Sequence, residues 1–138
     1  MKKARTTKLS RATAPRRNLE HYCRDLNGWP RSWMGMDKDL PPGEQLVACF
    51  RPFLEHLAAS DLSPKTIQNH VDNMWMLGGE FIRDLNYDPS LRKRPVEQQL
   101  AKMIENGGPL LYHGGEDAQR SFDATCRKFR RFLASPTS

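Results

Sequence analysis

Cysteine is scarce in this sequence, and long apolar runs are missing from it. The three cysteines, Cys23, Cys49 and Cys126, are odd in number and far apart, which is not the pattern of a disulfide framework. They are typical of free thiols in a reducing compartment, so we expect a cytoplasmic protein. No apolar run approaches the roughly 18 residues that cross a bilayer, and no apolar stretch follows the first basic residues. We therefore expect neither a membrane span nor a secretory signal.

Residues that carry catalysis or bind metals are few and scattered. The four histidines form no pair with a cysteine at the spacing of a zinc site. Glycine pairs occur at 107–108 and 114–115, but neither follows a predicted strand, as a phosphate-binding loop does. We therefore expect no cofactor, no metal and no catalytic residues, and hence a protein that is not an enzyme.

Acidic residues are absent from the first 17 positions. This segment holds seven of the 22 basic residues, so the rest of the chain has 15 basic against 16 acidic residues. Its few large apolar side chains would not offset the entropy cost of ordering it, and we predict a disordered basic arm over residues 1–17. Such an arm can contact DNA phosphates, or it can act only as a solubilising tail. An organelle transit peptide has a similar composition.

No segment alternates apolar and polar residues with the period of two that is typical of a β-strand. Apolar residues recur instead every three or four positions, which predicts an all-α protein, and 138 residues suit a single domain. We expect a compact bundle of four main helices, preceded by a short helix. The predicted main helices span about 42–60, 63–86, 95–106 and 116–134. The predicted domains are a disordered arm (1–17), a short helix and loop (18–41), a helical domain (42–134) and a tail (135–138).

The predicted core follows from the apolar positions of the main helices. Each helix has one wide apolar face, which should turn towards the other helices. The expected core residues are Leu46, Val47, Phe50, Phe53, Leu54 and Leu57 in the first main helix, Ile67, Val71, Met74, Leu77, Phe81 and Leu85 in the second, Val96, Leu100, Met103 and Ile104 in the third, and Phe122, Cys126, Phe129 and Leu133 in the fourth.

Glycine and proline mark the irregular positions. The short helix should end at Gly28, and a loop is expected over residues 29–43. Pro52 should bend the first main helix or divide it. The pair Gly78–Gly79 indicates close contact between the second main helix and a neighbouring helix, or a kink.

The second main helix has the clearest start in the sequence. Ser63 is a good N-cap, Pro64 suits the first helical position, and Leu62 can pack against Ile67. These residues therefore fix where the helix begins.

The stretch FRPFLEHLAASDLSPKTIQNHVDNMWMLGGEFIRDL, residues 50–85, resembles the core-binding domain of tyrosine recombinases and phage integrases. That family has a helix ending in a Phe-Leu-x-x-Leu pattern, a short turn, and a Leu-Ser-Pro-x-Thr-Ile entry into a long helix. Here the two patterns fall at residues 53–57 and 62–67. Two further helices follow in the family, so the resemblance covers roughly residues 42–134.

The resemblance implies a SAM-like helical module that binds DNA. Its implied partners are double-stranded DNA and a separate recombinase or transposase, as for an accessory protein of a mobile element in DNA recombination. Since the chain ends at Ser138, the family's catalytic domain is not expected in it, nor is recombination chemistry.

The resemblance also implies which residues contact DNA, because the second and fourth helices of the family face the duplex. Asn and Gln can pair with adenine edges, whereas Lys, Arg and the free N–H groups at a helix start suit phosphates. The same side chains are also typical of an ordinary solvated face. The candidate DNA-binding residues are Lys65, Gln68, Asn69 and Asn73 in the second main helix, Arg92, Lys93 and Arg94 in the turn after it, and Arg120, Arg127, Lys128 and Arg131 in the last helix.

Two other interpretations stay open. Residues 62–71 also resemble the recognition helix of LuxR-type regulators, which would make the chain a helix-turn-helix regulator. Alternatively, the domain is a protein-interaction module in which exposed aromatic residues such as Trp75 or Trp33 dock a partner chain. The DNA site, the partner and the oligomeric state are left open by the sequence.

Overall fold

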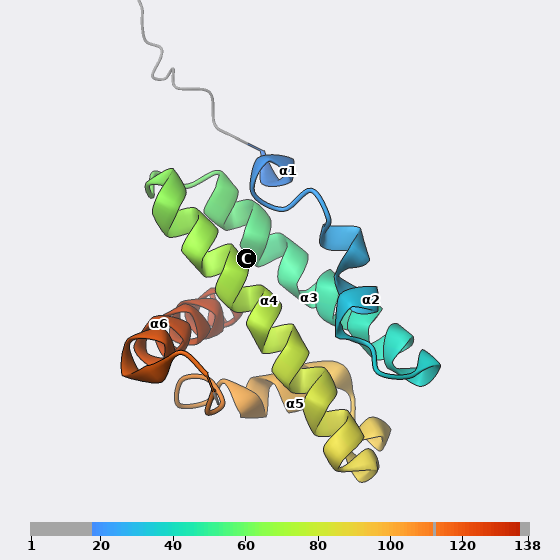
Figure 1. Ribbon diagram of the computed structural model, residues 1–138. Helices are drawn as coiled ribbons and strands as arrows, with labels where there is room; N and C mark the ends of the chain where they lie inside the picture. The colour runs from blue at the N-terminus through green and yellow to red at the C-terminus, as the bar shows by residue number, and fades with distance from the viewer. Residues whose placement is uncertain (1–17, 112, 136–138) are drawn as a thin grey trace, which may run out of the picture.

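The computed structural model of the chain describes residues 18–111 and 113–135. The predicted arm (1–17) and residues 136–138 of the predicted tail lie outside the described residues. Within them the protein is all-α, as predicted, because every regular element is an α-helix or a 3₁₀ turn. Figure 1 shows two long helices, α3 and α4, running antiparallel to each other, with α6 crossing behind α4.

The core lies against α3 (Leu40–Ala58) and α4 (Pro64–Tyr87). All the core residues predicted from these two helices are buried. Helix α3 begins two residues earlier than predicted, because Pro41 and Pro42 lie in its first turn, where a missing N–H costs no helical hydrogen bond. Pro52 does not divide α3, and its ring lies on the exposed side of the helix.

The predicted cap of α4 is confirmed. The Ser63 hydroxyl accepts a hydrogen bond from the backbone N–H of Thr66 at 3.1 Å, and Pro64 is the first residue of the helix. The helix therefore starts where the sequence pattern places it.

The segment before α3 differs from the prediction of one helix followed by a loop. It forms two short helices, α1 (Leu19–Tyr22) and α2 (Trp29–Trp33), with the 3₁₀ turns η1 (Leu26–Gly28) and η2 (Asp37–Asp39) after them. The predicted loop over residues 29–43 is therefore wrong. Its first residues are helical because α2 packs on both α3 and α4, which sequence periodicity over so short a segment does not reveal.

Trp33 joins this segment to α4. Its ring lies so close to Gly78 that a Cβ added there would be 2.1 Å from its Cζ2 atom. Its indole N–H donates to the carbonyl oxygen of Trp75 at 2.9 Å. The predicted close contact at the glycine pair is thus confirmed, and the neighbouring helix is α2.

After α4 the chain forms the 3₁₀ turn η3 (Pro89–Lys93) and two helices, α5 (Val96–Met103) and α6 (Gly115–Ala134). Helix α5 is shorter than predicted, since the backbone has left the helical region at Ile104 (φ −105°, ψ 16°).

The core residues predicted from α5 and α6 are buried, with two exceptions. Met103 is only partly buried, and Leu133 is exposed. The adjacent Phe132 packs against the core in place of Leu133, with its ring centroid 5.4 Å from that of Phe53.

Candidate nucleic-acid interface

Helices α4 and α6 meet through a polar network. The side-chain amide of Asn73 donates to the hydroxyls of Thr125 at 2.8 Å and Ser121 at 3.1 Å. Nδ1 of His70 lies 2.7 Å from the same Thr125 hydroxyl, which is fully buried. Because buried polar groups must find partners, this network fixes how the two helices sit against each other.

Asn73 is predicted to contact DNA, but its side chain does not face solvent. The residue is only 6% exposed, and α6 covers the side of α4 on which it lies. Its amide is needed by the fold and is not free to contact DNA. The spacing of four residues between Ser121 and Thr125 on α6 was the sequence signal for a polar contact at this position.

The other three candidates on α4 differ in burial and in hydrogen bonding. Lys65 and Asn69 are exposed. Gln68 is half-buried, and its amide donates to the carbonyl oxygen of Tyr22 at 3.1 Å and to Asp72 at 3.0 Å. Gln68 therefore ties the α1 segment to α4, whereas the side chains of Lys65 and Asn69 face solvent.

On α6, Arg127 and Arg131 are exposed and Lys128 is half-buried. Burial, and then the positive charge of Lys128, lower the pKa of His70, which places Lys128 beside the α4–α6 contact. None of these three bases forms an ion pair with another residue in the described part of the chain. We group Lys65 and Asn69 of α4 with Arg127, Lys128 and Arg131 of α6, and call these residues the α4–α6 face.

Arg120 has a partner on its own helix. It forms an ion pair with Asp117, and both side chains are exposed. Exposed pairs of this kind are weak, so Arg120 can exchange Asp117 for a phosphate.

Arg92 is committed to the fold. Its guanidinium lies 2.6 Å from the carboxylate of Asp39, which is fully buried. Burial alone would raise the pKa of Asp39, but hydrogen bonds from Arg92, Asn86 and the backbone N–H groups of Gly35 and Met36 lower it to about 2. Because breaking a buried pair is costly, we remove Arg92 from the DNA-binding candidates.

Lys93 and Arg94 lie on a second basic surface. Together with Lys38 they line a pocket of about 480 Å³ whose apolar lining includes Phe81 and Leu85. Arg94 also lines a second pocket, of about 610 Å³, together with Lys102 and Arg130. We call this the α5 basic surface; it consists of Lys38, Lys93, Arg94, Lys102 and Arg130.

The two basic surfaces adjoin on α6, where Arg130 is next to Arg131, but their α4 and η3 ends lie far apart. Helix α4 has 24 residues and so rises roughly 36 Å, with Lys65 in its first turn and η3 beyond its last. The turn candidates therefore do not join the start of α4. Lys38 and Lys102 were not predicted, because they come from distant segments that share no sequence pattern.

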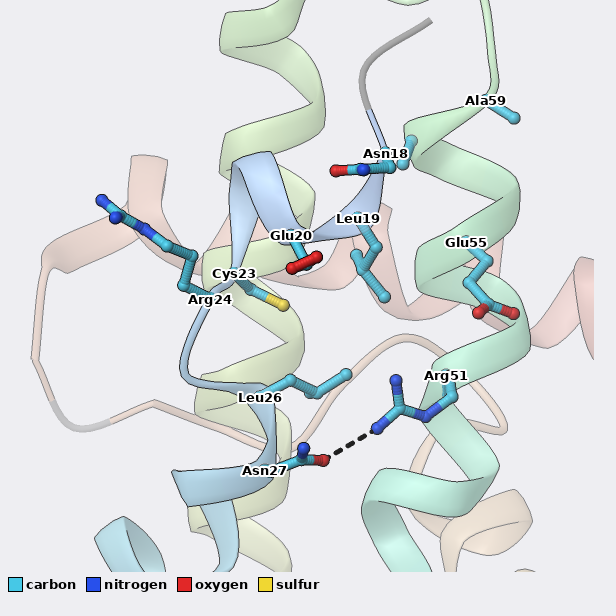
Figure 2. Close-up of a pocket in the computed structure, with 11 residues that line it drawn as sticks. Asn18, Leu19, Glu20, Cys23, Arg24, Leu26, Asn27, Arg51, Glu55 and Ala59 are labelled. Atoms are coloured by element: carbon cyan, nitrogen blue, oxygen red, sulfur yellow. Dashed lines mark hydrogen bonds between the residues drawn. The ribbon is translucent and has the colours of Figure 1, made fainter.

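A pocket of about 550 Å³ between α1 and α3 has mixed charge (Figure 2). The Cys23 thiol points into it, and Arg51 reaches from α3 to hydrogen-bond Asn27 at 3.0 Å. Burial, and then the negative charge of Asp25, raise the pKa of this thiol to about 11. The thiol is therefore protonated at neutral pH and is a poor nucleophile.

Within residues 18–111 and 113–135, no group of three or more His, Cys, Asp or Glu side chains could hold a metal ion. In the same part of the chain, every helix is too short or too polar to cross a membrane. Comparison of the chain with protein-family models, with curated proteins and with solved structures finds no match.

Proposed function

We propose that this protein is a non-catalytic module that binds double-stranded DNA through the α4–α6 face. The observation that carries the proposal is the contact of His70 with Thr125, beside Lys128. It places Lys128 of α6 beside the second turn of α4. These are the two helices that face the duplex in the family that the sequence resembles.

The residues of the face suit two kinds of contact. Arg127, Lys128 and Arg131 can pair with phosphates, which positions a protein on DNA without reading its sequence. Asn69 is exposed one turn after Lys65 and can reach a base edge in the major groove, where Asn pairs with adenine. The proposal therefore assigns affinity mainly to α6 and base recognition to α4.

In this proposal the chain acts beside a separate enzyme. It marks or bends a DNA site for a recombinase or transposase, as an accessory protein of a mobile element would. The chemistry is carried out by that enzyme.

The test is a gel-shift titration of the full chain against duplex DNA at low and at moderate salt. We expect a shift that weakens with salt, because phosphate contacts release counterions. A second titration uses a variant whose seven bases in residues 1–17 are replaced by Gln, and we expect it to retain part of the affinity.

Absence of any salt-sensitive shift would overturn the proposal in favour of a protein-interaction module. Loss of all affinity in the variant without arm bases, with Lys128→Gln harmless, would assign binding to residues 1–17 alone and contradict the role of the α4–α6 face.

A further inference from the structure

A separate pocket, of about 420 Å³, lies between the α1–α2 segment and α4. Three aromatic residues line it, Tyr22, Trp29 and Trp75, together with two acidic residues, Asp25 and Asp72. None of the described residues that line it is basic. The pocket is acidic, whereas the two surfaces described above are basic. Aromatic rings together with carboxylates suit a positively charged ligand.

Trp75 is the exposed wall of this pocket. Its side chain is 42% exposed, which is unusual for so large an apolar group. Its indole N–H donates to the Ser32 hydroxyl at 2.9 Å, and that hydroxyl donates to the carbonyl oxygen of Trp29 at 2.6 Å. The ring is therefore held in one orientation, so a ligand that stacks on it need not immobilise it.

The two carboxylates are available to a ligand. Asp72 uses one oxygen to accept a hydrogen bond from Gln68, which itself is anchored to the carbonyl oxygen of Tyr22. Asp25 is exposed. Neither forms an ion pair with another residue in the described ranges. A cation between them would gain two charge-assisted contacts in addition to the aromatic face.

The chain carries a segment of matching chemistry directly before this pocket. Residues 1–17 hold seven bases and no acid. They lead through Asn18 into α1 (Leu19–Tyr22), whose last residue lines the pocket. Seventeen residues reach up to roughly 55 Å when extended, so the distance to the pocket is no obstacle.

We propose that this pocket is a binding site for arginine and lysine side chains, and that residues 1–17 of the same chain supply them. A guanidinium or ammonium group stacks on the Trp75 ring and pairs with Asp72 and Asp25. Arg is the better ligand, because its planar group both stacks on an indole and forms paired hydrogen bonds with a carboxylate.

The experiment follows the indole N–H resonance of Trp75 by NMR in the full chain, assigned with Trp75→Phe. A second full-length protein has Gln in place of the seven bases of residues 1–17. We expect the resonance to differ between the two proteins. Adding a synthetic peptide of residues 1–17 to the Gln variant should return the resonance towards its wild-type position.

Matched substitutions test the carboxylates. Asp25→Asn with Asp72→Asn should abolish the effect of the peptide. Glu44→Gln with Glu97→Gln, which removes the same charge from exposed positions on α3 and α5, should leave that effect intact. Thermal unfolding of each variant checks that it is folded.

Two results would overturn the proposal. One is a peptide effect that persists when both aspartates are replaced, since the pocket would then not be the site. The other is an identical Trp75 resonance in the wild-type protein and the Gln variant. If, in that second case, the added peptide still moved the Trp75 resonance of the Gln variant, the occupant would be a basic segment of another protein instead of residues 1–17. These readouts contain no DNA, so they are independent of the proposed function.

Discussion

The ring of Trp33 fills the space in which a side chain at residue 78 would begin. A Cβ on Gly78 would lie 2.1 Å from Trp33 Cζ2, whereas a Cβ on the adjacent Gly79 would lie 3.6 Å from Trp33 Cδ1, an ordinary van der Waals distance. A side chain therefore fits at position 79 of α4 but not at position 78. Only the first is required by the docking of α2.

We predict opposite effects of alanine at these two positions. Gly78→Ala should lower the free energy of unfolding by about 1–3 kcal/mol, because the methyl group displaces Trp33. Gly79→Ala should raise it by about 0.5–1 kcal/mol, because alanine favours the helix and meets no clash. Urea unfolding of both variants measures this. Equal effects of the two substitutions would contradict the docking of Trp33 on Gly78.

The buried pair of Asp39 and Arg92 predicts a pH dependence. The pKa of Asp39 is about 2 in the folded protein and ordinarily 3.8, so its contribution is complete above pH 4 and is lost as the pH falls towards 2. A difference of nearly two pKa units corresponds to about 2 kcal/mol.

Asp39→Asn should therefore cost about 2 kcal/mol at pH 7 and progressively less below pH 4. Denaturant unfolding of the wild-type and variant proteins from pH 7 to pH 2 gives both values. A constant difference over that range would show that the charge of Asp39 is not responsible.

His70 predicts a dependence at higher pH. Burial and Lys128 lower its pKa below the ordinary 6.5, so the folded state binds a proton less readily than the unfolded state. Its contribution to stability is therefore complete above pH 6.5 and is lost as the pH falls below that value. His70→Gln should flatten the stability curve in this range.

An NMR titration tests the cause of the His70 shift. Lys128→Gln should raise the pKa of His70 towards its ordinary value. Lys65→Gln removes a lysine that does not influence His70, and it should leave that pKa unchanged. If neither substitution changed the pKa of His70, Lys128 would not lie beside the α4–α6 contact.

Asn69 and Asn73 separate DNA binding from folding. Asn73→Ala should lower stability by about 1–3 kcal/mol, because it removes the amide that bridges α4 and α6. Asn69→Ala should leave stability within about 0.5 kcal/mol and weaken DNA binding. Unfolding curves and DNA titrations of both variants check this. If Asn69→Ala left DNA binding unchanged, or weakened it only by lowering stability, the assignment of Asn69 as a DNA contact would be wrong.

Much of the fold could be predicted from sequence because its signals are local. The Ser63 cap and the apolar faces of the long helices depend on residues within a few turns of each other. Helix α2 could not be predicted, since it forms by packing Trp29 and Trp33 on helices distant in sequence.

The candidate site was predicted less completely than the fold. Asn73 and Arg92 have the same residue types as free DNA contacts, and only their partners, Thr125 and Asp39, reveal a structural role. Sequence spacing shows which face of a helix a residue occupies, but not which element covers that face. Lys38 and Lys102 of the α5 basic surface were missed for the same reason, because they join Lys93 and Arg94 only in three dimensions.

The salt dependence of DNA affinity tests the central claim most directly. The measurement compares the full chain, the variant Arg127→Gln/Lys128→Gln/Arg131→Gln and a matched variant of the α5 basic surface, Lys93→Gln/Arg94→Gln/Lys102→Gln. If α6 contacts phosphates, the first variant should reduce the slope of log K against log salt concentration by about 2–3, and the second should leave it unchanged. An unchanged slope in the first variant, or a reduced slope in the second alone, would contradict DNA binding through the α4–α6 face.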